Sequence, residues 1–62
     1  MSKLYKITES DGHITEEYAD EHTVISYAND MIWEFNNGAL VGTIKQAIAY
    51  LKKAHDVIVS ER

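Results

Sequence analysis

The sequence predicts a single small α+β domain over residues 1–62, in which an N-terminal antiparallel β-hairpin packs against two amphipathic helices and a short C-terminal third strand. Three observations predict this ββααβ order. Apolar and polar residues alternate around an Asp-Gly pair, and two later segments repeat apolar residues every three to four positions. A β-branched run, Val57-Ile58-Val59, follows the second of these segments.

Residues 3–19 predict the hairpin, because Tyr5 and Ile7 alternate with polar residues and Asp11-Gly12 suits a two-residue type I′ turn. That turn sets a register of four cross-strand pairs: Tyr5 with Tyr18, Lys6 with Glu17, Thr8 with Thr15, and Ser10 with His13. The face toward the core is then expected to hold Tyr5, Ile7, Ile14 and Tyr18.

Residues 20–37 predict the first helix, which covers the apolar face of the hairpin. Its core-facing stripe is expected at Val24, Ala28, Met31 and Phe35, with Tyr27 and Ile32 beside it. Asp20 or Thr23 can cap its start, and Asn36-Asn37-Gly38 favours a stop. Trp33, the only tryptophan, lies nearly opposite the stripe among polar residues.

A short link, residues 39–42, precedes the second helix, and its Leu40 and Val41 are expected to close one end of the core. Thr43 and Gln46 have the spacing of a capping box. The helix that follows is expected to direct its apolar side chains inward: Ile44, Ala47, Ile48 and Leu51.

The segment after the second helix allows two structures. A third strand at residues 57–60 is favoured because a two-stranded hairpin is barely stable alone. However, Ile58 lies seven residues beyond Leu51, on the same helical face, with no Gly or Pro between them. The alternative is therefore ββαα with a long last helix.

The composition argues against several classes of function. The absence of Cys removes disulfides, zinc–thiolate sites and thiol catalysis, and the three glycines do not form a phosphate-binding loop. His13, His22 and His55 lie near acidic residues without the spacing of a recognised metal site. We expect no catalytic site, cofactor or metal. The sequence has neither a long apolar run nor a basic-then-apolar leader, so we expect a cytoplasmic protein without a membrane span.

Charge is distributed unevenly along the chain. Residues 7–44 contain no Lys or Arg but eight acidic residues, Glu9, Asp11, Glu16, Glu17, Asp20, Glu21, Asp30 and Glu34. This segment therefore carries −8, while the remaining residues carry six basic and two acidic side chains, or +4. Phosphate repels carboxylate, so this charge argues against nucleic-acid binding by the central segment and favours a partner with a basic surface.

These observations predict a non-enzymatic protein-binding module with two groups of contact residues. One is Trp33 with Asn29, Asp30 and Glu34, because tryptophan on a polar helix face is typical of binding hot spots. The other is the acidic group Glu16, Glu17, Asp20 and Glu21. A narrower hypothesis is an inhibitor or regulator of a nucleic-acid-handling protein. Small accessory proteins of phages and other mobile elements, including anti-CRISPR-type inhibitors, are an analogy for that role.

Three alternatives remain at this point. Trp33 can be covered by the Leu40–Val41 link or by the C-terminal tail. The chain can be a homodimeric nucleic-acid binder that uses Lys45, Lys52 and Lys53 of the second helix. Finally, it can be a purely structural homo-oligomer.

Overall fold

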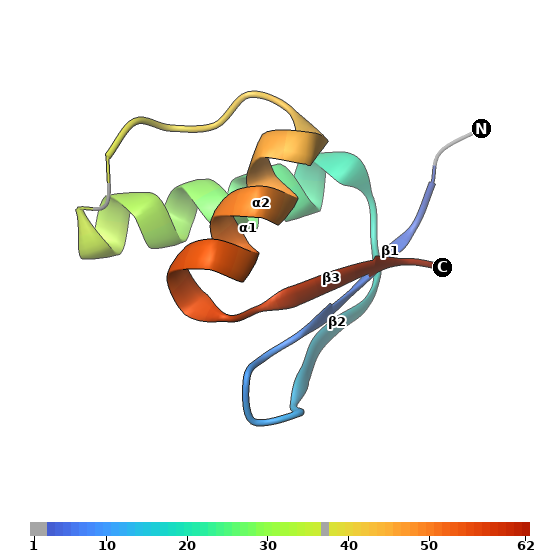
Figure 1. The fold of residues 1–62 in the computed structure, drawn as a ribbon. Coiled ribbons are helices and arrows are strands. Elements are labelled where there is room, and N and C mark those ends of the chain that lie inside the picture. Colours follow the sequence, from blue (N-terminus) through green and yellow to red (C-terminus); the bar gives the residue numbers. More distant parts are fainter. Residues whose placement is uncertain (1–2, 37) are drawn as a thin grey trace.

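The computed structural model describes residues 3–36 and 38–62 and confirms the α+β fold with the order ββααβ (Figure 1). Its elements are β1 (Tyr5–Thr8), β2 (Ile14–Ala19), α1 (Glu21–Phe35), α2 (Ile44–His55) and β3 (Ile58–Glu61). The three strands form one antiparallel sheet in the order β2-β1-β3, and both helices lie on the same side of it (Figure 1). The helices in the described part of the chain are too short or too polar to cross a membrane.

The core lies between the sheet and the helices. Its most buried residues come from β1, β2, α1 and α2 and from the position just before β3. They are Tyr5, Ile7, Ala19, Val24, Ala28, Ile32, Ala47, Leu51 and Val57. Val59 of β3 packs partly buried against them. Because β1 is the central strand, its alternation of Tyr5 and Ile7 with polar residues places two large side chains directly under the helices.

The predicted hairpin exists, but the predicted register is wrong at both ends. Glu9 N–H donates to His13 O at 2.7 Å, and Gly12 N–H donates to Glu9 O at 2.9 Å. The loop therefore has three residues rather than two, with Gly12 alone at positive φ (93°). Thr8 consequently pairs with Ile14 rather than with Thr15.

Two irregularities in the β1–β2 ladder shift the pairing in the opposite direction. The first brings Ile7 opposite Glu16, as the predicted register requires, and the second brings Tyr5 opposite Ala19 instead of Tyr18. The small Ala19 is buried in the position predicted for a tyrosine. Tyr18 and Ile14 were expected on the core face, yet they are 63% and 44% exposed. The Ser10–His13 pair is not formed because Ser10 lies in the three-residue loop, and the Lys6–Glu17 pair is not formed because Lys6 falls at the irregularity between Tyr5 and Ile7.

Helix α1 begins as predicted at Asp20, whose carboxylate accepts a hydrogen bond from Thr23 N–H at 2.8 Å. It ends at Asn36, which takes the left-handed conformation itself (φ 54°). Asn37, predicted as part of the same stop, lies outside the described residues.

The predicted stripe on α1 is correct at Val24 and Ala28 but wrong at its C-terminal end. Ile32 is buried there, whereas Phe35 is 58% exposed and Met31 is only half-buried. Figure 1 explains the difference, because the last turn of α1 extends past the end of the sheet and nothing in the sheet covers it.

Helix α2 begins as predicted, with Thr43 Oγ1 accepting from Gln46 N–H at 3.1 Å. The Gln46 side chain accepts from Gly42 N–H rather than from Thr43 N–H, one residue earlier than a capping box requires. Of the link residues, Val41 packs against the core as expected, whereas Leu40 is 64% exposed.

The end of α2 decides between the two predicted structures of the tail. Asp56 adopts the left-handed conformation (φ 57°), and Val57 N–H donates to Leu51 O at 3.0 Å. This cap stops the helix at His55 without a glycine, and β3 follows at once. The alternative with a long last helix is therefore wrong.

Candidate functional site

Trp33 is the most exposed large apolar side chain in the described part of the chain, at 82%. Neither the Leu40–Val41 link nor β3 covers it, so the alternative of a covered Trp33 is wrong. Asp30, three residues earlier, and Glu34, the next residue, are also exposed. At about 100° per residue both carboxylates lie on one flank of Trp33, and we call these three residues the Trp33 surface.

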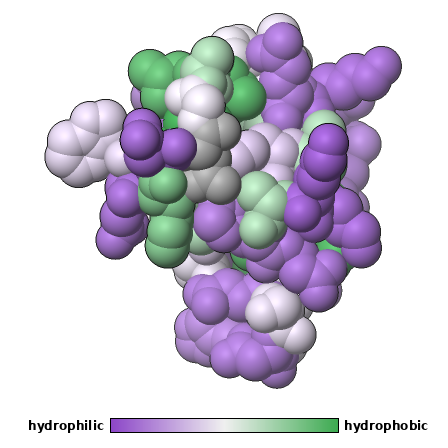
Figure 2. All heavy atoms as spheres, turned by 60° about the vertical axis from the view of Figure 1, so that its left-hand side comes forward, coloured by the Kyte–Doolittle hydropathy of each residue, from purple (hydrophilic) through white to green (hydrophobic). Residues whose placement is uncertain are grey.

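The carboxylates of the Trp33 surface have no ion-pair partner among the described residues. They are therefore available to a cation on another molecule. On the other flank of the helix, about one turn before Trp33, Asn29 holds Val41 of the link that follows α1, and the neighbouring Leu40 is 64% exposed. Figure 2 shows hydrophobic side chains reaching the surface at this end of the molecule beside strongly hydrophilic ones. The arrangement offers an indole with negative charge on one side and apolar surface on the other.

Asn29 was predicted as a contact residue, but its side chain is used to hold the link in place. Its amide N–H donates to Val41 O at 3.0 Å, and its Oδ1 accepts from Val41 N–H at 2.7 Å. Both groups are partly buried. Asn29 thus holds the link in place, and this use of its amide orients the side chain toward the link rather than toward a partner.

Phe35 is an exposed aromatic residue that the sequence assigned to the core. It lies nearly opposite Trp33 around α1, and its ring is 5.1 Å from the ring of His55 at the end of α2. The Tyr50 hydroxyl lies 2.8 Å from His55 Nε2, and burial raises the pKa of Tyr50. This aromatic group closes the end of the two-helix layer and does not join the Trp33 surface.

The second predicted group, the acidic residues at the end of the hairpin, is largely engaged within the chain. Glu17 lies 3.9 Å from Arg62, and Glu21 accepts a hydrogen bond from the Tyr5 hydroxyl at 3.5 Å. Burial, followed by the Glu21 carboxylate, raises the pKa of Tyr5. Asp20 caps α1, and the hydrogen bond from Thr23 N–H lowers its pKa. Glu16 is exposed with no ion pair among the described residues.

The two predicted groups do not form one surface. Trp33 follows Glu21 by twelve residues of α1, which at about 1.5 Å per residue separates their positions along the helix by about 18 Å. They also lie about 120° apart around the helix axis, at about 100° per residue. A compact binding surface can include the Trp33 surface or the hairpin acids, and only the former combines free carboxylates with exposed apolar groups.

Arg62 takes part in an arrangement that the sequence did not indicate. Its guanidinium lies 4.6 Å from the centre of the Tyr18 ring and donates to the Tyr18 hydroxyl at 3.2 Å. It joins β3 to β2 across the central strand, and its backbone N–H donates to Leu4 O at 2.8 Å. Only knowledge of the strand order β2-β1-β3 would have brought these distant residues together.

The lysines of α2 are all exposed, and Lys52 lies 3.9 Å from Asp56. Among residues 3–36 and 38–62, no three His, Asp or Glu side chains are grouped so that they could hold a metal ion.

A scan against protein-family models found no match for this chain, and neither did searches of curated proteins and of solved structures.

Proposed function

We propose that this chain is a non-enzymatic protein-binding module that contacts its partner through the Trp33 surface. The observation that carries the proposal is the 82% exposure of Trp33 next to two carboxylates without ion-pair partners in the described chain. Tryptophan is the residue type most enriched at binding hot spots, where its large surface becomes buried.

The chemistry of the surface favours a partner with a basic side chain beside an apolar one. An Arg or Lys of the partner can lie over the Trp33 indole, which is the best aromatic acceptor for a cation, while it pairs with Asp30 or Glu34. An apolar side chain of the partner can then cover Leu40 on the other flank. The charge of −8 over residues 7–44 adds longer-range attraction toward the same kind of partner.

A narrower form of the proposal identifies the partner as a nucleic-acid-handling protein whose basic surface otherwise holds phosphate. The chain would then act as an inhibitor or regulator by occupying that surface. Its support is the charge distribution alone, since a surface that binds phosphate is complementary to carboxylates.

The test is affinity capture from a lysate of the source organism with wild-type protein and two variants. Trp33→Ala removes the proposed anchor, while Tyr18→Ala removes another exposed aromatic from the opposite side of the sheet. We expect a protein retained by wild type and by Tyr18→Ala but lost with Trp33→Ala. Equal retention by all three would contradict the proposal.

A salt titration of the captured complex separates the general proposal from the narrower one. Exposed charges are screened over about 10 Å at 0.1 M salt, so charge-dominated binding weakens steeply between about 50 and 500 mM. The narrower form also requires that added DNA or RNA displaces the chain from its partner. Binding that depends on Trp33 but is unaffected by both salt and added nucleic acid would support docking through the Trp33 surface and exclude inhibition by charge mimicry.

A further inference from the structure

The two outer edges of the sheet differ in how they are protected. The β1–β2 ladder contains two irregularities, and β2 carries Glu16 and Glu17, which are features that discourage pairing with another strand. The β1–β3 ladder is regular over four consecutive pairs, from Tyr5 with Glu61 to Thr8 with Ile58. The outer edge of β3 is therefore straight, and no strand in the described part of the chain pairs with it.

The backbone groups that face outward from β3 follow from its pairing with β1. Arg62 N–H donates to Leu4 O, which makes this a hydrogen-bonded pair, and antiparallel pairs alternate. Ser60 and Ile58 accordingly bond to β1, while the N–H and C=O groups of Val59 and Glu61 point away from it. These four groups are those that an added strand would use.

We propose that a second copy of this chain adds to the edge, with two β3 strands antiparallel and Ser60 on the two-fold axis. In this register Val59 lies opposite Glu61 of the second copy, and each pair exchanges two N–H···O bonds. The symmetry applies the same exchange twice, giving four backbone hydrogen bonds and one continuous six-stranded sheet.

The side chains of β3 are complementary to themselves in this register. Ser60 meets a second Ser60, which is small and uncharged, and Ile58 lies opposite Arg62, so like charges are not directly opposed. Glu61 shares the helix-covered face of the sheet with its partner Tyr5. In the antiparallel arrangement Glu61 of the second copy comes beside Val59, near the start of β3.

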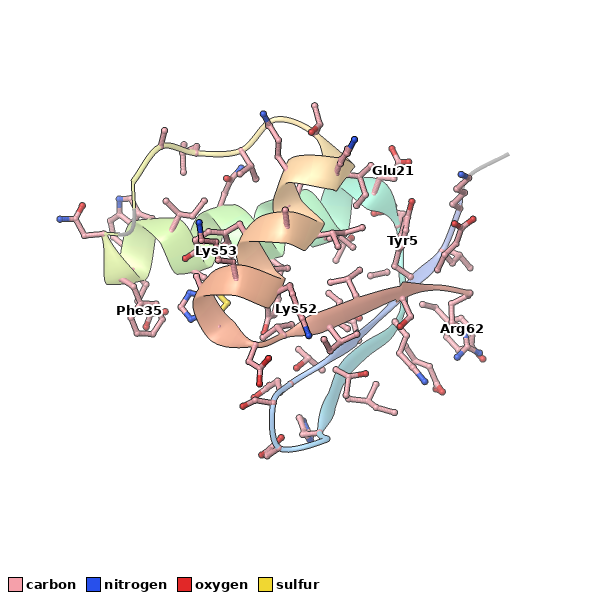
Figure 3. The ribbon with its side chains drawn as sticks, in the orientation of Figure 1. Tyr5, Glu21, Phe35, Lys52, Lys53 and Arg62 are labelled. Carbon is pink, nitrogen blue, oxygen red and sulfur yellow. The ribbon has the colours of Figure 1, made fainter. Side chains whose placement is uncertain are left out.

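Glu61 lies 3.7 Å from Lys3 of its own chain, and Lys52 of the second copy provides a further positive charge for it. Figure 3 shows Lys52 extending from α2 toward β3, and its only partner in the described chain is Asp56, at 3.9 Å. Two Lys52–Glu61 contacts between copies follow from the symmetry. This charge complementarity, the straight edge and the outward backbone groups all favour a second copy as the occupant.

The test is sedimentation velocity over a range of protein concentrations, combined with amide hydrogen exchange. We expect a monomer–dimer equilibrium in which the Val59 and Glu61 amides become protected as concentration rises, while Ser60 is protected throughout. Glu61→Pro removes one outward donor but no bond to β1, so it should abolish the dimer and leave the fold intact. Glu61→Gln is its control, because it keeps the N–H and removes only the charge, so it should weaken the dimer without abolishing it.

A charge exchange provides a second test in case Glu61→Pro disturbs the sheet. Lys52→Glu and Glu61→Lys should each weaken the dimer, whereas the double variant should restore it. A wild type that stays monomeric throughout, or a folded Glu61→Pro variant that dimerises like wild type, would overturn the proposal. So would loss of the dimer in Trp33→Ala, since that would place self-association at the Trp33 surface instead.

Discussion

Replacing Asn29 by alanine tests whether this residue holds the link beside Trp33. The side chain makes two partly buried hydrogen bonds with the backbone of Val41, at 2.7 and 3.0 Å. A hydrogen bond of this kind contributes about 0.5–1.5 kcal/mol net, so their joint loss should lower the free energy of unfolding by about 1–3 kcal/mol. That is a large fraction of the total stability of so small a domain.

Urea denaturation followed by circular dichroism measures this loss. With a urea m-value of about 1 kcal/mol/M, the transition midpoint should fall by about 1 M or more. Asn29→Asp keeps the acceptor for Val41 N–H and loses the donor, so it should lie between wild type and Asn29→Ala. Asp30→Ala is the neighbouring control and should stay within about 0.5 kcal/mol of wild type. Equal midpoints for Asn29→Ala and Asp30→Ala would refute the structural role of Asn29.

Three further predictions concern the fold. Arg62→Ala should lower the free energy of unfolding by about 1 kcal/mol through loss of the Tyr18 contact. Tyr18→Phe should lower it by less, because the ring remains. Equal stability of wild type and Arg62→Ala in urea titrations would contradict that contact. The pKa of Asp20 is lowered by the bond from Thr23 N–H, so the contribution of its charge to stability is present above the unfolded pKa and lost as pH falls through the folded pKa. Asp20→Ala should therefore be less stable than wild type at pH 7, and the difference should become smaller in acid. A difference that does not change with pH would contradict this. Leu51→Ala removes a fully buried side chain and should lower the free energy of unfolding by about 2–5 kcal/mol, so circular dichroism should show much of the protein unfolded. A thermal transition at the wild-type temperature would contradict the central place of Leu51 in the core.

The elements could be predicted from the sequence because each has a local signal. Asp20 and Thr43 cap the two helices where the sequence placed them. Ile58 and Val59 of the β-branched run begin β3, which spans residues 58–61 rather than the predicted 57–60, while Val57 is buried in the core. The hairpin register could not be predicted, because Asp11-Gly12 fits both a two-residue and a three-residue loop. The two irregularities that bring Ala19 opposite Tyr5 and under the helices also have no local signal, because they depend on the assembled fold.

The candidate site was predictable in part. The helical period alone placed Trp33 on the polar face of α1 with Asp30 and Glu34, and the structure leaves all three exposed. The period could not show that α1 extends past the sheet, so the burial of Phe35 was overestimated. It also could not show that Asn29 is used by the link, because that contact joins residues twelve apart through a loop.

The direct measurement of the proposed function uses the fluorescence of Trp33, the only tryptophan in the chain. In the free protein, emission should lie at the long-wavelength end typical of a hydrated indole, and acrylamide should quench it efficiently. The captured partner is used in a form without tryptophan, either naturally or after substitution of its own tryptophans. On binding, the Trp33 emission should shift to shorter wavelength and become protected from quenching. Unchanged emission and quenching in a complex whose formation is verified by sedimentation would contradict docking through the Trp33 surface.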